Sequence, residues 1–234
     1  MNEVINLPGL SNRQFLERFA KCGRVGLAGG ITLIDRTIAR AQRHLDTDKR
    51  WSPWTHSFIF QGQRPDGHHW VIESDLQIAR KHIHLGVQEN RIEKYFDEEL
   101  YTTLAVLDFD IETEKEMILL REGLELVASR VRYSLRELVG TWIALRHGEL
   151  REQENLLARN SSFYCSAFVQ HLFRKAGIDL APGLDAKNTT PEDISRTPVP
   201  HTTYLLQRAV ATSKVKELAS RVRRRVKAKI KKTE

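Results

Sequence analysis

The chain is organised around the stretch SSFYCSAFVQHLF, which spans residues 161–173. Apolar residues recur in it at i, i+3, i+4, i+7 and i+8, which predicts an amphipathic helix with one buried face. These residues are Cys165, Phe168, Val169, Leu172 and Phe173. Either of the two preceding serines is suited to cap the helix by accepting a free backbone N–H. Cys165 would then lie in the first turn, where unpaired N–H groups and the helix dipole favour a thiolate.

Cys165 has two interpretations on this stretch alone. A lone cysteine is most often a small buried side chain that packs a core. A cysteine at the start of a helix is instead a nucleophile when a base lies beside it. The rest of the chain must decide between the two.

The composition is that of a globular protein with one domain and an appended tail. At 234 residues the chain can bury a sizeable core, and 41% apolar with 29% charged residues is ordinary for such a protein. No apolar run approaches the ~18 residues of a transmembrane helix. Residues 1–10 lack the basic start and long apolar core of a signal peptide.

The cysteines point to a reducing compartment. Cys22 and Cys165 are far apart in the sequence and form no Cys-x-x-Cys pair. Such usage is not that of a disulfide scaffold, and it provides no zinc motif. We therefore predict a cytoplasmic protein.

The positive charge of the chain lies at its C-terminus. The net charge is +7, and residues 214–234 contain ten Lys or Arg and two Glu, a net +8. The rest of the chain is therefore at −1, and any inference from basicity concerns this segment alone. We assign residues 1–212 to the globular domain and 213–234 to a basic amphipathic tail.

The tail is predicted to be a basic helix with a narrow apolar stripe. The stripe comprises Val215, Leu218, Ala219, Val222, Val226 and Ile230. Such a helix can lie in the headgroup region of an anionic membrane, which would make the protein peripheral at that membrane. Phosphate contacts with nucleic acid and a solvated, partly disordered terminus are the alternatives, and nucleic acid is the least favoured of the three.

The N-terminal half predicts two helices and then a hairpin. Ser11-Asn12-Arg13-Gln14 is a capping box, so a helix is expected from it to Cys22, ended by Gly23. A short strand is expected at 24–27, and a second helix at 31–45 with one apolar face buried in the core. Residues 54–62 and 69–74 alternate like two strands around the turn RPDG at 64–67.

The remaining chain predicts more strands and a long helical segment. Strand-like runs at 82–87 and 102–111 add to a small antiparallel sheet. Residues 113–160 read as two helices with a break between Tyr133 and Glu149. A short turn is expected at 191–194, and the chain is predicted to become helical again from Tyr204.

Two polar residues in the hairpin suggest chemistry. His56 shares a strand face with two phenylalanines, an unusual choice for packing alone. Glu73 follows an apolar run on the partner strand, where an unpaired carboxylate is costly. If the register places them side by side, they form a base and the group that orients it, the two partners that a nucleophilic thiolate needs. Taken singly, His56 could be a surface residue and Glu73 a solvated acid.

Three segments in this order resemble a known family. They are WTHSFI at 54–59, VIES at 71–74 and FYCSAFV at 163–169. The order resembles the circularly permuted papain-like (NlpC-type) cysteine hydrolases, in which the cysteine follows the histidine. TPEDI at 190–194 resembles the short Pro-initiated segment after the cysteine helix of that family. The resemblance covers roughly residues 24–195.

The resemblance implies a permuted papain-like α+β fold, here with two departures. The family usually has a Gly-Asp pair before the first strand, where this chain has Gly23-Arg24. The helical segment before the Cys165 helix is also longer than a minimal domain needs. The expected architecture is a small antiparallel sheet packed against helices, with this extra helical segment and a basic C-terminal helix.

The resemblance also implies roles for individual residues. Cys165 would be the nucleophile, His56 the general base and then acid, and Glu73 the residue that orients His56. The Cys165 backbone N–H, helped by Tyr164, would form an oxyanion hole. The reaction class is formation of a thioester from an amide or ester, followed by attack of water or an amine. The family includes peptidoglycan-type peptidases, other amidases and lecithin:retinol acyltransferase-like enzymes.

Several histidines invite a metal hypothesis, which the spacing does not favour. The histidines concerned are His68, His69, His82 and His84. Strand alternation puts His68 and His69 on opposite faces, and no Cys or acid cluster has ligand spacing with them. We therefore predict no metal and no cofactor, and keep His69 as a second polar residue of the active face.

The leading prediction is a thiol-dependent amidase, peptidase or acyltransferase that acts on a peptide or lipid-like amide or ester. The alternative is a non-catalytic papain-like scaffold that binds an anionic membrane or nucleic acid through its tail, because a fold does not guarantee activity. The sequence defines no oligomeric state.

Overall fold

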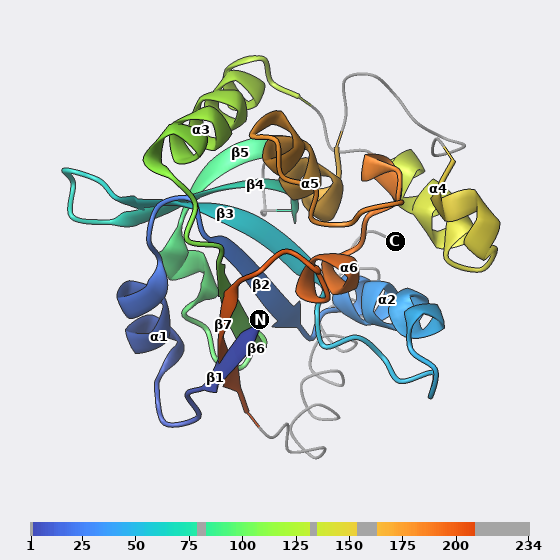
Figure 1. Ribbon diagram of the computed structural model, residues 1–234. Helices are drawn as coiled ribbons and strands as arrows, with labels where there is room; N and C mark the ends of the chain where they lie inside the picture. Colours follow the sequence, from blue (N-terminus) through green and yellow to red (C-terminus); the bar gives the residue numbers. More distant parts are fainter. Residues whose placement is uncertain (1, 79–82, 132–134, 154–162, 209–234) are drawn as a thin grey trace, which may run out of the picture.

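The computed structural model describes residues 2–78, 83–131, 135–153 and 163–208 (Figure 1). Its centre is a seven-stranded sheet in the order β1-β7-β6-β2-β3-β4-β5. The strands are β1 (Glu3–Asn6), β2 (Val25–Gly30), β3 (His56–Gln63), β4 (His69–Ile78), β5 (Ile83–Arg91), β6 (Tyr101–Asp108) and β7 (Thr202–Gln207). The α+β class is as predicted. The prediction of a small antiparallel sheet is wrong, because the sheet is larger and mixed, with β1 parallel to β7.

Helices cover both faces of the sheet, with α3 and α5 on one side and α1 on the other (Figure 1). The α-helices are α1 (Asn12–Phe19), α2 (Leu33–Ala41), α3 (Thr113–Ala128), α4 (Leu135–Ala144), α5 (Cys165–Lys175) and α6 (Pro191–Ser195). The described ranges also contain the short 3₁₀ helices η1 (Gln42–Leu45), η2 (Ile92–Tyr95), η3 (Gly148–Arg151) and η4 (Ala186–Asn188).

Strand alternation divides the core into two clusters. Ile59 and Ile72 are opposite each other on β3 and β4 and pack on the α5 side. Phe60 and Val71, the next pair, pack on the α1 side. The apolar stripe of α5 is buried as the sequence predicts, since Phe168, Val169, Leu172 and Phe173 are fully enclosed. Helix α5 is therefore held rigidly against the sheet, and its start is fixed with it.

Helix α1 ends earlier than predicted. The Ser11–Gln14 capping box forms, but the helix stops at Phe19, so Cys22 lies beyond it instead of in its last turn. The backbone already pairs with β3 at this point, because the Gly23 N–H donates to the Phe60 carbonyl. Gly23 has a φ of +74°, which a residue with a side chain rarely adopts. Sheet pairing therefore ends the helical pattern.

The expected start of a helix at Tyr204 is also wrong, because Thr202–Gln207 is strand β7, while the rest of that predicted helix, from residue 209, lies outside the described residues. This strand lies between β1 and β6, which satisfies its backbone groups on both sides. Leu206 is fully buried opposite Leu104 of β6. Pairing with a strand on each side stabilises the extended conformation more than the weak helical preference of this six-residue segment stabilises a helix.

The long helical segment breaks before the predicted position. Helix α3 ends at Ala128, ahead of the Tyr133–Glu149 window. Arg130 follows with a φ of +51°, and the Val131 carbonyl accepts a hydrogen bond from the Val87 N–H of β5. The hydrogen bond to the edge strand β5 therefore competes with the continuation of helix α3, which ends before it. A second helix follows as α4, which ends at Ala144, and residues 154–160 of the predicted helical segment lie outside the described residues. The predicted turn at 191–194 appears as α6.

The tail at 213–234 and the boundary with the globular domain lie outside the described residues. Among the residues that are described, no helix has the length and hydrophobicity to span a bilayer.

Candidate active site

Cys165 is the first residue of α5, in the first turn as predicted. The predicted serine cap is wrong: the residue before the helix is Tyr164, whose side chain makes no capping hydrogen bond. Ser161 and Ser162 lie outside the described residues. The first turn contains no acidic residue, so no carboxylate of the helix itself offsets the positive end of its dipole at the sulfur.

The structure brings His56 and Glu73 together. His56 is the first residue of β3, and its Nε2 lies 2.6 Å from Oε2 of Glu73 on β4. Glu73 is completely buried, and only 14% of the His56 side chain is exposed. Since Nε2 faces the carboxylate, Nδ1 is the ring nitrogen left for the thiol. The Cys165 side chain is close enough to this ring to raise its pKa.

The interactions of His56 with its two neighbours keep its ring protonated. Burial alone would lower the pKa of His56, but its hydrogen bonds and charge interactions with Cys165 and Glu73 raise it to about 10. The ring is therefore an imidazolium at neutral pH, between the sulfur and a carboxylate. An imidazolium beside a thiolate is the charged pair that activates a cysteine nucleophile.

Three residues that the sequence did not reveal hold Glu73 ionised. Lys94 Nζ and Asn90 Nδ2 each lie 2.7 Å from Oε1, and the Tyr95 hydroxyl donates to Oε2. Lys94 also contacts Asp75 at 2.5 Å. Burial would raise the pKa of Glu73, but the charges and hydrogen bonds of Lys94 and His56 keep it well below the ordinary value. A carboxylate predicted to be buried requires a cation near it, but the sequence does not identify which cation.

The Tyr164 hydroxyl fixes the start of α5 through hydrogen bonds within the protein and does not point into the space beside the sulfur where a substrate carbonyl would lie. Its hydroxyl lies 2.8 Å from the Thr189 carbonyl and 2.9 Å from the Lys187 carbonyl, and it accepts a hydrogen bond from Thr141. The hydroxyl proton is thus directed at backbone carbonyls. The backbone N–H of Cys165, which has no partner one turn earlier in α5, is the more direct candidate for an oxyanion donor.

His69 is not brought to the pair. It lies four residues before Glu73 on β4, roughly 13 Å away along the strand. Its Nδ1 contacts the Ala20 carbonyl at 3.1 Å, at the end of α1. The prediction that His69 lines the same site is therefore wrong, because the strand carries it to the far end of the hairpin.

Within the described ranges, no three His, Cys, Asp or Glu side chains come together in a group suited to hold a metal ion. His68 pairs with Glu93 instead. His82 lies outside those ranges.

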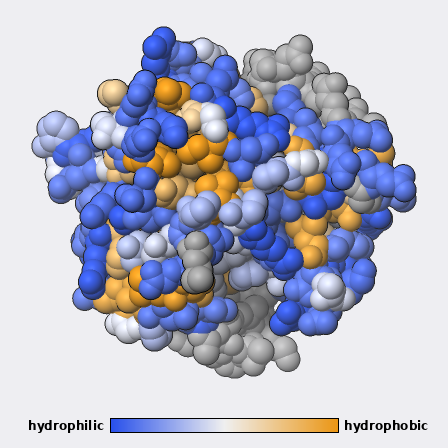
Figure 2. Space-filling view, in the orientation of Figure 1, coloured by the Kyte–Doolittle hydropathy of each residue, from blue (hydrophilic) through white to orange (hydrophobic). Residues whose placement is uncertain are grey.

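A mostly apolar pocket of about 290 Å³ opens beside the sulfur. It lies where α2, α4 and α6 meet at the start of α5, and Figure 2 shows an apolar area over this part of the molecule. Its lining includes Ile38, Trp142, Leu145, Cys165 and Pro191. The apolar stripe predicted to bury α2 in the core lines this pocket in part.

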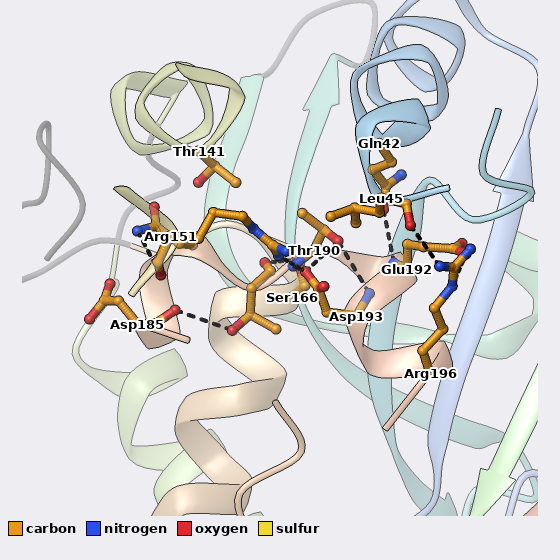
Figure 3. Close-up of polar contacts among 12 residues, drawn as sticks. Gln42, Leu45, Thr141, Arg151, Ser166, Asp185, Thr190, Glu192, Asp193 and Arg196 are labelled. Atoms are coloured by element: carbon orange, nitrogen blue, oxygen red, sulfur yellow. Dashed lines mark hydrogen bonds and ion pairs between the residues drawn. The ribbon is translucent and has the colours of Figure 1, made fainter. Parts of the chain in front are cut away.

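The wall formed by α6 is fixed by polar contacts (Figure 3). Thr190 and Asp193 form a capping box, and Arg151 pairs with Asp193 at 2.5 Å. The Glu192 N–H donates to the Gln42 side chain of η1 at 2.8 Å. These contacts tie α6 to the end of α2, so two walls of the pocket are held relative to Cys165.

Cys22 provides an internal comparison for Cys165. Burial and the neighbouring carboxylate of Glu116 raise the pKa of Cys22 to about 11. No imidazole of the described residues contributes to this shift in the pKa of Cys22. Cys22 is therefore a thiol at neutral pH, consistent with a structural role.

Iodoacetamide is expected to alkylate Cys165 at least about 100-fold faster than Cys22 at pH 7. With a pKa of about 11, about one in 10⁴ of the Cys22 thiols is ionised at that pH, whereas Cys165 has an imidazolium partner. Peptide masses at timed intervals give both rates. Cys22→Ser should leave the rate at Cys165 unchanged, and equal rates at the two sulfurs would rule out an activated thiolate.

Comparison with known proteins gives a likeness of fold. No protein-family model and no curated protein matches the chain. Among solved structures, it is similar to the metalloprotein yiiX from Escherichia coli O157:H7, with a TM-score of 0.50 and 11% identity. The match covers 78% of this chain and 95% of that one. Fold and site together define an α+β protein with a buried Cys-His-Glu arrangement. The likeness itself carries no information on activity.

Proposed function

We propose that this protein is a cysteine hydrolase or acyltransferase of the permuted papain-like type, acting on an amide or ester. One observation carries the proposal: His56 interacts with the Cys165 sulfur and contacts a buried, ionised Glu73 through its other ring nitrogen. A cysteine that merely packs a core needs neither an imidazolium nor a carboxylate. The order of the three residues along the chain agrees with that family.

The first half of the reaction forms a thioester. The Cys165 sulfur attacks the carbonyl carbon, and the oxygen takes up the negative charge opposite the Cys165 backbone N–H. The C–N or C–O bond then breaks, and the leaving group takes the proton of the His56 Nδ1. Glu73 keeps the ring oriented, and its charge stabilises the imidazolium before that transfer.

The second half returns the enzyme to its starting state. Water, an amine or an alcohol attacks the thioester while the neutral His56 accepts its proton. The new C–O or C–N bond forms, the C–S bond breaks, and the thiolate–imidazolium pair is restored. Water gives hydrolysis, and an amine or alcohol gives acyl transfer.

The pocket supports a substrate with an apolar acyl group. Its 290 Å³ volume is close to the smallest that binds organic ligands, and Cys165 forms part of its wall. An aliphatic chain there would bury against Ile38 and Leu145 and bring its carbonyl to the sulfur. This favours a lipid-like amide or ester over a polar peptide.

A series of p-nitrophenyl esters with acyl chains of two to twelve carbons tests the proposal. We expect a burst of one p-nitrophenol per protein and an acyl adduct on Cys165, faster for chains of intermediate length. Cys165→Ser should abolish the burst and Cys22→Ser should leave it intact. An adduct on Cys22 in place of Cys165, or no adduct with any ester, would reject the enzyme proposal. The non-catalytic scaffold would then be the remaining hypothesis.

A further inference from the structure

A second, strongly basic pocket adjoins the one at Cys165. Its volume is about 450 Å³, and it shares Thr37, Ala41 and Trp142 with the first pocket. The charged side chains in its lining are Arg36, Arg40, Arg43 and Arg146, together with His44. They come from α2, η1 and the segment that follows α4, so the fold gathers these cations from two distant parts of the chain.

Among the described residues, no acidic side chain balances the positive charge in this pocket. Its lining contains no Asp or Glu, and none of its four arginines forms an ion pair within the part of the chain that is described. Two acids close in sequence are engaged elsewhere: Asp35 caps α2, and Asp46 pairs with Arg50 and Arg196. The pKa of His44 is lowered by burial and by the nearby positive charges of Arg43 and Arg146.

The geometry favours an anion with a planar or tetrahedral oxygen group. Guanidinium groups bind carboxylate and phosphate through paired N–H donors, and several of them around one space concentrate the potential. Trp51 and Trp142 flank the pocket and are 49% and 39% exposed, with the Arg146 guanidinium 3.7 Å from the Trp142 ring. An exposed aromatic side chain beside arginine side chains is suited to contact a ligand where its apolar chain joins its charged group.

We propose that this arginine pocket binds the anionic group, a phosphate or a carboxylate, of the molecule whose apolar part enters the Cys165 pocket. The inference rests on the proposed function in one respect, that this molecule is the substrate. The substrate is then an anionic amphiphile, with its charged group over α2 and its acyl carbonyl at the sulfur. Trp142 lies at the boundary because it lines both pockets.

Binding to the full-length Cys165→Ala protein tests this without catalysis. Calorimetric titration is done with octyl phosphate below its aggregation concentration, with octanol, with inorganic phosphate and with phosphatidylglycerol vesicles. Arg36→Gln/Arg40→Gln removes two exposed charges of α2, and Arg13→Gln/Arg121→Gln removes two exposed charges from α1 and α3 as the matched control. We expect octyl phosphate to bind about 10- to 100-fold more weakly to the first variant and unchanged to the control.

The other ligands separate the sources of the anion. Octanol should bind equally to both variants, and inorganic phosphate more weakly than octyl phosphate. Equal affinity of the two variants for octyl phosphate would overturn the inference. It would also be overturned if inorganic phosphate bound as tightly, or if only phosphatidylglycerol vesicles and no monomer bound. The Cys165→Ala protein cannot react, so binding to it is independent of catalysis. If this binding depends on the arginines but the unmodified protein gives no ester burst, the proposed catalytic function is rejected and the proposed anion site is retained.

Discussion

The Glu73→Gln variant is expected to acylate Cys165 about 10²- to 10⁴-fold more slowly while remaining folded. Lys94 and Asn90 both donate to Oε1 of Glu73, so the amide oxygen must occupy that position. The amide nitrogen then replaces Oε2 and donates a hydrogen to His56 Nε2. Nδ1 would keep its proton toward the sulfur and could not accept another. The neutral ring would no longer be an ion-pair partner for a thiolate.

The ester burst gives the rate, and iodoacetamide alkylation of Cys165 at pH 6–7 should slow with it. The second measurement separates the orientation of His56 from a general structural effect, because circular dichroism should be unchanged. Glu89→Gln, on the neighbouring strand β5, is the control and should react like the unmodified protein. A Glu73→Gln burst within threefold of the unmodified rate would mean that the His56–Glu73 contact does not serve the reaction.

The Lys94→Met variant is expected to lose about 3–5 kcal/mol of unfolding free energy at pH 7. Lys94 is the cation between Glu73 and Asp75, and its side chain is only 20% exposed. Methionine fills similar space but leaves a buried carboxylate without its main counter-charge. Urea unfolding measures the loss. The double variant Lys94→Met/Glu73→Gln should be more stable than Lys94→Met, since the uncompensated charge is gone.

The same network predicts how this loss depends on pH. The pKa of Glu73 is depressed in the folded protein, so its ion pairs stabilise the fold above the unfolded value of about 4.3. That stability is lost as the pH falls from there through the folded pKa. The difference between the unmodified protein and Lys94→Met should therefore shrink below about pH 4. A difference that stays constant from pH 7 to 3 would assign the effect to packing instead of charge.

The central part of the site could be predicted because its signals are local. Helical periodicity placed Cys165 in the first turn of α5. Strand alternation around the 64–67 turn put His56 and Glu73 on one face, where they touch. Each step needs only the fixed periods of helix and strand and a recognisable turn.

The surroundings of the site could not be predicted because they depend on long-range packing. Lys94 and Tyr95 lie in a short 3₁₀ helix, and nothing in their local sequence indicates that it folds back over Glu73. The apolar stripe of α2 was predicted to be core, and its Ile38 lines a pocket instead. Periodicity identifies an apolar face, but it does not tell whether a side chain or a ligand covers it.

Strand β1 pairs in parallel with β7, so residues 3–6 find their partners only at residues 202–205. A ribosome adds about 5–20 residues each second, so β1 waits roughly 10–40 s after its synthesis before β7 exists. During that time its backbone groups are open to a neighbouring nascent chain. Because β1 has four residues, it exposes few backbone groups for such mispairing. Its short length therefore limits aggregation during translation.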